Sequence, residues 1–284
     1  MTPLRQTRLV VFLLTTFGIS WASWWTLASL VSSGSASPAV PGAPTALTAG
    51  QRLFVRLFVV GGFGPTIAAY VAILATPGEG RLREFHARMF KWRVGVRWYL
   101  AALGVPLALA VGVVLVAQAI RPGVLGGLAI SPWYRAFLLF PLIAVGGGGN
   151  EELGWRGIAQ PALEQRTSRV TAPLVVGLIW GLWERPLFSV PAGVPLAQTS
   201  FSIYVVDTVG LSLILAWIYG ATQSILMCVL FHAAVNTMSV MGLPTPHELG
   251  GATGATTALL EVMVGLGLIL STKSGEPALT ARGA

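Results

Sequence analysis

Residues 98–120, WYLAALGVPLALAVGVVLVAQAI, form an uninterrupted apolar run without a charged side chain. A helix of about 20 apolar residues can cross the ~30 Å hydrocarbon core of a bilayer. The run lacks the alternation of polar and apolar residues that a barrel strand would show. Helices and closed barrels are the structures that satisfy their backbone hydrogen bonds in lipid. This stretch therefore predicts a transmembrane helix.

Similar runs recur along the chain and predict an all-α, polytopic membrane bundle. We expect about eight transmembrane helices, at residues 9–31, 53–75, 98–120, 133–149, 170–190, 201–219, 223–242 and 256–271. The fourth run has a helical continuation. The first run is longer than the ~7–15-residue core of a signal peptide and is interpreted as a retained span. Because no internal repeat is evident, residues 1–284 are expected to form a single membrane domain.

The composition favours the same class of protein. Of the 284 residues, 54% are hydrophobic and 10% are charged, whereas a soluble domain carries roughly 25% charged residues. Such a chain has too few polar groups to cover a surface that faces water, so long apolar stretches have to face lipid. The single cysteine, Cys228, excludes a disulfide framework or a multi-cysteine metal site within one chain.

The net charge of +8 is unevenly distributed, because six of the 18 basic residues lie between Arg81 and Arg97. This segment interleaves basic with large apolar side chains, a pattern typical of a helix in the membrane interface. Its place between hydrophobic runs indicates a bilayer with anionic lipids as partner, and not nucleic acid. We therefore predict a basic interfacial segment at residues 81–97.

Arginine and lysine also predict the orientation of the chain, because they accumulate in cytoplasmic loops. Besides residues 81–97, the loops on one side of eight alternating spans would contain Arg5, Arg8, Arg156, Arg166, Arg169, Lys273 and Arg282. The opposite loops contain few basic residues, such as Arg52 and Arg121. We therefore predict a multi-pass protein of the cell membrane with both termini in the cytoplasm.

Ionisable side chains within spans are costly and mark functional sites. The first cluster is NEELGWRGIAQP at residues 150–161, directly after four glycines. On a helix, Glu152 and Arg156 stand at i and i+4 and can pair, while Glu151 points about 100° away and keeps its carboxylate free. Burial away from a cation favours the neutral form of a carboxyl, which suits a general base near neutral pH. The alternative is a solvated helix end just outside the membrane.

Two further clusters lie in later spans. Glu184 lies about fourteen residues into the span at 170–190, where it can also serve as the structural partner of a distant arginine. His232 and Asn236 stand at i and i+4 in the span at 223–242 and project in the same direction. An imidazole and a carboxamide can together donate hydrogen bonds to a developing oxyanion. The alternative is a histidine whose hydrogen bonds are satisfied in the core.

Two other acids, Asp207 and Glu261, also lie in spans but have no patterned neighbour. We interpret both as structural or partly exposed and leave them outside the site. One histidine with several carboxyls and an asparagine would also accommodate a divalent ion. Because the second histidine that zinc would want is missing, we expect neither a metal nor another cofactor.

Taken together, the three clusters resemble the signature of the CAAX-protease and bacteriocin-processing family, also called the self-immunity family in bacteria. That family shows Glu-Glu-x-x-x-Arg, Phe-x-x-x-His and His-x-x-x-Asn motifs on successive helices. Glu151, Glu152 and Arg156 match the first motif, and His232 and Asn236 match the third. The likeness extends over residues 133–242, the expected catalytic core.

The second motif departs from the family pattern. Trp180 stands where phenylalanine or tryptophan is common, but Glu184 occupies the position of the histidine. In the family, this histidine is thought to help the first glutamate activate water. Glu184 can still serve if it shares a proton with Glu151, because close like charges favour protonation of one of them.

The resemblance implies a glutamate-type intramembrane endopeptidase that cleaves a membrane-associated or lipid-modified protein or peptide near the cytoplasmic side. By position, Glu151 would be the general base. Glu152 and Arg156 would form the structural pair, and His232 and Asn236 the oxyanion site. Substrate and lipid bilayer are the expected partners.

Two other functions stay open. Glu184 also fits a catalytically inactive relative that acts as a membrane immunity or scaffold protein. Buried glutamate and histidine also occur in the proton relays of carriers, although the repeats typical of carriers are not evident here.

Overall fold

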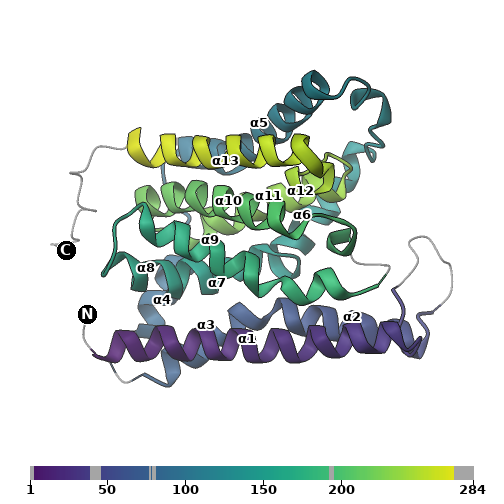
Figure 1. Cartoon of the computed structure of the whole chain (residues 1–284). Coiled ribbons are helices and arrows are strands. Elements are labelled where there is room, and N and C mark those ends of the chain that lie inside the picture. The colour runs from purple at the N-terminus through teal and green to yellow at the C-terminus, as the bar shows by residue number, and fades with distance from the viewer. Residues whose placement is uncertain (1–2, 39–45, 77, 79–80, 192–194, 272–284) are drawn as a thin grey trace.

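The computed structural model describes residues 3–38, 46–76, 78, 81–191 and 195–271. Every regular element in this described part is helical, so the all-α prediction is confirmed. Figure 1 shows the long helices side by side, with the start of α1 (Pro3–Ser32) and the end of α13 (Gly251–Ser271) at the same end of the bundle. Of the residues used to predict the orientation, Lys273 and Arg282 lie outside the described residues.

In the part of the chain that the structure describes, four helices are long and apolar enough to cross a membrane. They are α1, α5 (Val96–Ile120), α10 (Phe201–Thr222) and α13. A fifth candidate is the pair α2 (Ala49–Gly62) and α3 (Gly64–Leu74), which is bent by 46° next to Pro65 in the first turn of α3. Proline cannot donate the backbone hydrogen bond that would continue the preceding helix. Several helices thus suit a multi-pass membrane protein, while the number of eight remains a prediction.

The predicted spans at residues 133–149, 170–190 and 223–242 hold shorter helices. These are α6 (Ala136–Gly146), α9 (Thr171–Trp183) and α11 (Ile225–Val240). The predicted helical continuation follows the glycines as four consecutive short helical segments. They are η3 (Gly149–Glu151), α7 (Glu152–Gly154), the π-helical η4 (Trp155–Ala159) and α8 (Gln160–Glu164). The other short elements are η1 (Leu125–Gly127), η2 (Trp133–Arg135), η5 (Arg185–Ser189), η6 (Pro195–Gln198) and α12 (Pro246–Leu249).

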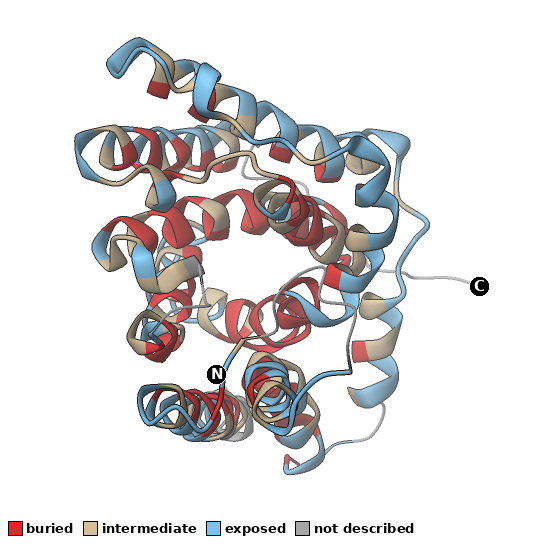
Figure 2. Ribbon diagram, turned by 90° about the vertical axis from the view of Figure 1, so that its right-hand side faces the viewer, coloured by how far each residue is buried: buried red, intermediate tan, exposed pale blue. Residues whose placement is uncertain are grey.

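Glycines allow the helices of the bundle to approach closely, as small residues do at interfaces between membrane helices. A Cβ on Gly177 of α9 would lie 2.6 Å from Val209 Cα of α10, and one on Gly265 of α13 would lie 2.6 Å from Leu213 Cβ of α10. Figure 2 shows that buried residues face inward and exposed ones outward. Large apolar side chains such as Leu100 of α5 are exposed, which suits a surface covered by lipid.

The basic segment at residues 81–97 contains α4 (Arg81–Met89) and packs against one end of the bundle. Arg88 donates a hydrogen bond to the Tyr219 hydroxyl at 2.6 Å. Lys91 Nζ donates to the Thr222 carbonyl at 2.8 Å, at the C-terminal end of α10, where a cation also meets the negative end of the helix dipole. The segment is therefore anchored where α10 ends and α11 begins.

We predict that the end of the bundle that carries α4 faces the cytoplasm, because basic residues accumulate there. From this end, α5 leads about 37 Å to the exposed loop that contains Gly123. In a Cys228→Ser background, a membrane-impermeant maleimide added to intact cells should label Gly123→Cys. It should spare Arg83→Cys until the membrane is permeabilised. Labelling of Arg83→Cys in intact cells would contradict this orientation.

Candidate active site

A cavity of ≈ 370 Å³ inside the bundle brings together side chains that are far apart in the sequence. Its wall includes Glu151 from η3, Glu184 from the end of α9, and both His232 and Asn236 from α11. The three clusters of the sequence thus meet in one place. Glu152 and Arg156 are absent from the cavity wall and lie behind it, fully buried.

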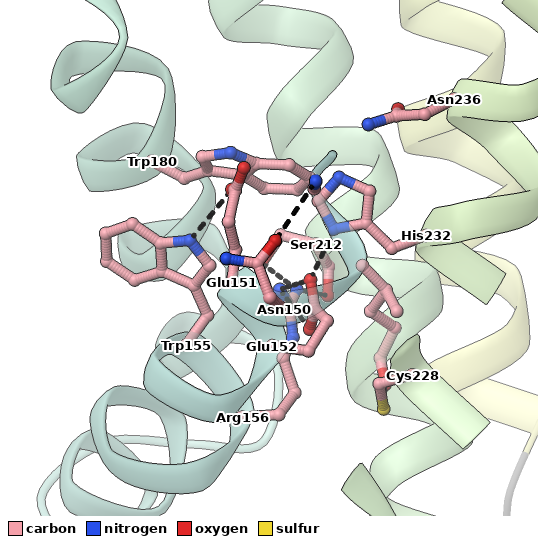
Figure 3. Close-up of polar contacts among 12 residues, drawn as sticks. Asn150, Glu151, Glu152, Trp155, Arg156, Trp180, Ser212, Cys228, His232 and Asn236 are labelled. Atoms are coloured by element: carbon pink, nitrogen blue, oxygen red, sulfur yellow. Dashed lines mark hydrogen bonds and ion pairs between the residues drawn. The ribbon is translucent and has the colours of Figure 1, made fainter. Parts of the chain in front are cut away.

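Glu152 is the centre of a buried network of charges. One carboxylate oxygen lies 3.0 Å from Arg156 Nη1, and the other lies 2.8 Å from His232 Nδ1. Arg156 is in turn held by Ser212 of α10, whose Oγ accepts from Nη2 at 2.9 Å. Figure 3 shows Glu152 between the arginine and the histidine. The network therefore joins α7, η4, α10 and α11.

The contact with Glu152 also determines which nitrogen of His232 carries a proton. An ionised carboxylate only accepts hydrogen bonds, so Nδ1 of His232 is the donor. The other ring nitrogen, Nε2, then accepts a hydrogen bond when the ring is neutral and donates one when the ring is protonated. Trp180 packs against the ring, with the centroids 5.0 Å apart, and helps to fix its orientation.

Nε2 of His232 and Nδ2 of Asn236 converge beside the glycine run. Asn236 Nδ2 donates to the Gly147 carbonyl at 2.9 Å. Gly148 has φ +116°, and a Cβ at this position would collide with Asn236 Nδ2 and lie 2.8 Å from His232 Nε2. A residue with a side chain would therefore fill the space in front of the two nitrogens. The glycine keeps this part of the cavity open.

Glu151 is buried, with 7% of its surface exposed, and points away from the Glu152 network. Its Oε2 accepts a hydrogen bond from Trp155 Nε1 at 3.4 Å. Among the described residues, no arginine or lysine forms an ion pair with it. Because Arg156 is bound to Glu152, the Glu151 carboxylate is left free to face the cavity.

Glu184, which stands in place of the motif histidine, shares the cavity with Glu151. Its Oε1 accepts from Trp180 Nε1 at 3.2 Å, and Tyr204 lines the cavity together with it. The two carboxyls interact electrostatically. The cavity thus holds a pair of acids, and no arginine or lysine in the described part of the chain forms an ion pair with either.

Asp207 and Glu261 were predicted to be structural or partly exposed. The prediction of partial exposure was wrong. Both are buried, at 3% and 6% exposure, and both line the cavity. His247 of α12, which the sequence analysis did not single out, lies beside them, with Nδ1 2.6 Å from Asp207 Oδ2. An acid within an apolar span was the available signal for Asp207. His247 lies in a loop and gave no such signal.

No group of three or more histidine, cysteine, aspartate and glutamate side chains in the described part of the chain is placed to hold a metal ion. The expectation that the protein uses no cofactor remains a prediction.

The cavity lies in the half of the bundle away from α4. α11 begins at the α4 end, where Ser224 Oγ donates to the Lys91 carbonyl at 2.6 Å. It ends next to residues 243–248, which line the cavity. The sequence analysis expected cytoplasmic termini together with cleavage near the cytoplasmic side. In this fold the two expectations exclude each other, because α4 and the cavity lie towards opposite ends.

We predict that Gly148→Ala destabilises the protein more than Gly123→Ala does. Both glycines have positive φ values, +116° and +104°, but a Cβ on Gly123 would meet open space. Each variant should therefore lose roughly 1 kcal/mol of unfolding free energy to backbone strain. Gly148→Ala should lose about 1–3 kcal/mol more through overpacking. Equal losses in detergent-micelle unfolding would show that His232 and Asn236 do not crowd Gly148.

The comparisons with known proteins agree with the motifs. Residues 132–238 match the family model of type II CAAX prenyl endopeptidase Rce1-like proteins. The chain is also similar to CAAX prenyl protease 2 of Methanococcus maripaludis, with 29% identity over 117 residues. The alignment covers 39% of this chain and 42% of that protein, so it spans less than half of either. All six predicted site residues lie within the matched region, so this region of the chain is similar to the Rce1-like CAAX prenyl endopeptidases, in agreement with the resemblance of its motifs.

Proposed function

We propose that this protein is an intramembrane endopeptidase that hydrolyses a peptide bond in a membrane-associated or lipid-modified protein or peptide. The observation that carries the proposal is the convergence of Glu151, Glu184, His232 and Asn236 on one cavity inside an apolar bundle. Such side chains are costly at membrane depth unless they face each other or water. The family match and the name of the archaeal relative support a protease.

Glu151 is the proposed general base. Two close carboxyls do not both ionise readily, so Glu151 and Glu184 are expected to hold one proton between them. The ionised carboxyl takes a proton from water as the water oxygen bonds to the carbonyl carbon of the substrate. The neutral one can donate a hydrogen bond to water or substrate. A proton reaches the leaving nitrogen when the C–N bond breaks.

His232 and Asn236 are the proposed oxyanion donors. Asn236 Nδ2 carries two protons and uses one for the Gly147 carbonyl, so one remains for the substrate. His232 Nε2 donates only when the ring is protonated, and Glu152 Oε1, 2.8 Å from Nδ1, fixes the orientation of the ring. Removing one oxyanion donor typically costs about 100–1,000-fold in kcat. Glu152 and Arg156 therefore act behind the cavity, by positioning His232.

The cavity wall also indicates the kind of substrate. Beyond the polar groups it continues over apolar side chains of α2, α5 and α6, among them Phe58, Leu109 and Ile143. Such a wall suits a lipid chain or an apolar peptide segment. With α4 in the cytoplasm, this substrate would reach the cavity from the opposite side of the membrane.

We expect Glu151→Gln to lower proteolysis by about 1,000-fold, because glutamine cannot take the proton from water. The assay uses the full-length protein in liposomes with two fluorogenic peptides that end in a CAAX sequence, one farnesylated and one unmodified. Glu164→Gln is the matched control, because this acid on α8 does not line the cavity. Unchanged thermal unfolding of Glu151→Gln would show that the fold is intact.

Two results would contradict the proposal. Cleavage that survives Glu151→Gln would remove Glu151 from the mechanism. A parent protein that cleaves neither peptide, together with a Glu184→His variant that does, would favour the inactive relative with an immunity or scaffold role.

A further inference from the structure

A second polar cluster lies on the wall of the same cavity. Its centre is the pair formed by His247 Nδ1 and Asp207 Oδ2, which are 2.6 Å apart, with side chains 11% and 5% exposed. Glu184 and Tyr204 line the cavity together with this pair. Glu261 of α13 is buried and lines the same cavity as Asp207. The hydrolysis steps described above do not use any member of the pair.

The imidazole of His247 is held at both ring nitrogens. Nδ1 is bound to Asp207, and Nε2 lies 3.1 Å from Thr245 Oγ1. The Thr245 hydroxyl is also 2.9 Å from Glu248 Oε2, within the capping box that begins α12. The Tyr204 ring packs edge-on against the imidazole, with the centroids 5.0 Å apart. The ring is therefore fixed by three separate contacts.

This arrangement accommodates His247 in two protonation states without moving the ring. When the ring is protonated, Nε2 donates to Thr245 Oγ1, and the Thr245 hydroxyl donates to Glu248. When the ring is neutral, the hydroxyl rotates and donates to Nε2. Glu248 keeps its hydrogen bond from the Thr245 backbone N–H, at 2.8 Å, in either case. A proton can therefore be lost or gained at Nε2 at low structural cost.

The cluster is connected to the catalytic acids through Glu184. Glu184, Tyr204 and His247 lie on the same cavity wall, and the Tyr204 ring packs on His247. The charge of Glu184 also acts on His247 across the cavity. Glu184 is the residue that replaces the histidine of the second family motif. An imidazole is thus present next to this position, but it comes from a different element, α12.

We propose that His247, held by Asp207, is a positioning residue that exchanges a proton with Glu184 and so supplies the imidazole that position 184 lacks. The inference rests on the proposed protease function. His247 begins protonated, and its Nε2 proton passes through cavity water and the Glu184 carboxyl to the leaving nitrogen as the C–N bond breaks. The proton that Glu151 took from the attacking water returns to Nε2 by the same path. After these transfers, Glu151, Glu184 and His247 each have the protonation state in which they began.

The charges around His247 favour its protonated form. Burial lowers the pKa of His247, but the hydrogen bond and charge of Asp207 and the charges of Glu248 and Glu184 outweigh it, so the pKa lies above the ordinary histidine value. Tyr204 and Glu261 are the other titratable groups near the pair. Because the pKa is raised in the folded state, the pair stabilises the fold at low pH. That stabilisation is lost as the pH rises through the raised value.

The coupling to Glu184 can be measured without any activity assay. The chain has three histidines, His86, His232 and His247, so isotope-labelled histidine gives an NMR spectrum that His86→Asn and His247→Asn assign. We expect His247 in the full-length protein to titrate above the ordinary histidine value and to shift to lower pH in Glu184→Gln. Glu164→Gln should leave it unchanged. A His247 titration that does not respond to Glu184→Gln overturns the proposal.

The role in catalysis is tested with His247→Asn and the farnesylated CAAX peptide. Asparagine can still donate to Asp207 but cannot titrate, so kcat should fall about 100-fold with little change in KM. The alkaline limb of the pH–rate profile should move, because only His232 then has to stay protonated, whereas a purely structural role of His247 would leave the limb in place. His86→Asn, whose ring bonds to Tyr70 outside the cavity, should behave like the parent. An unaltered profile in His247→Asn overturns the proposal. If the unmutated protein cleaves neither peptide, the proposed protease function is overturned instead. The NMR titration then still tests the coupling between His247 and Glu184.

Discussion

The structure depends on one buried carboxylate, Glu152, which is bound on one side by Arg156 and on the other by His232. Taking a charged group out of water is expensive, and the cost is recovered only with good geometry and further hydrogen bonds. Arg156 and His232 both hydrogen bond with Oε1 of Glu152, and Ser212 accepts a hydrogen bond from Arg156. The same carboxylate fixes the proton on Nδ1 of His232 and occupies the arginine, which leaves Glu151 free beside it. Glu152 thus separates the roles of two adjacent acids.

The site forms where regular helix structure breaks down. α6 ends at the glycine run, and the chain passes through the turn at Gly148 and a π-helical segment before α8 begins. A continuous helix through this region would direct backbone and side chains into the space that the cavity occupies. Irregular backbone is tolerated at membrane depth only where it is buried in protein or lines a polar space. The irregular backbone after α6 therefore lines the cavity, and the polar cavity is what makes such backbone tolerable at membrane depth.

Much of the architecture follows from the sequence, because apolar runs and i, i+4 spacing are local properties. Helices, the pairing of Glu152 with Arg156, and the shared direction of His232 and Asn236 belong to this group. Contacts between segments that are distant in the sequence are not local properties, and the sequence alone does not predict them. The bond between His232 and Glu152 joins residues 80 positions apart, and neither spacing nor composition predicts it. The predicted spans at residues 133–149 and 170–190 were longer than the helices found there, because apolar runs continue through breaks such as the one after Gly146.

The position of His247 shows the same limit. Its partner Asp207 lies 40 residues earlier, and only the packing of α12 against α10 brings the two together. A motif comparison notes that position 184 lacks a histidine, but it does not reveal an imidazole that another element contributes. The imidazole of His247 is therefore evident from the residues that line the cavity and not from the motif.

The central claim is that the buried Glu152–Arg156 pair holds the site together, and a double-mutant cycle on unfolding free energy tests it most directly. Arg156→Met alone leaves the Glu152 carboxylate without its cation and should cost about 3–5 kcal/mol. The double variant Glu152→Gln/Arg156→Met should be clearly more stable than the sum of the two single losses implies. Strictly additive losses, or a loss below ~0.5 kcal/mol for Arg156→Met, as for an ordinary surface substitution, would contradict the account.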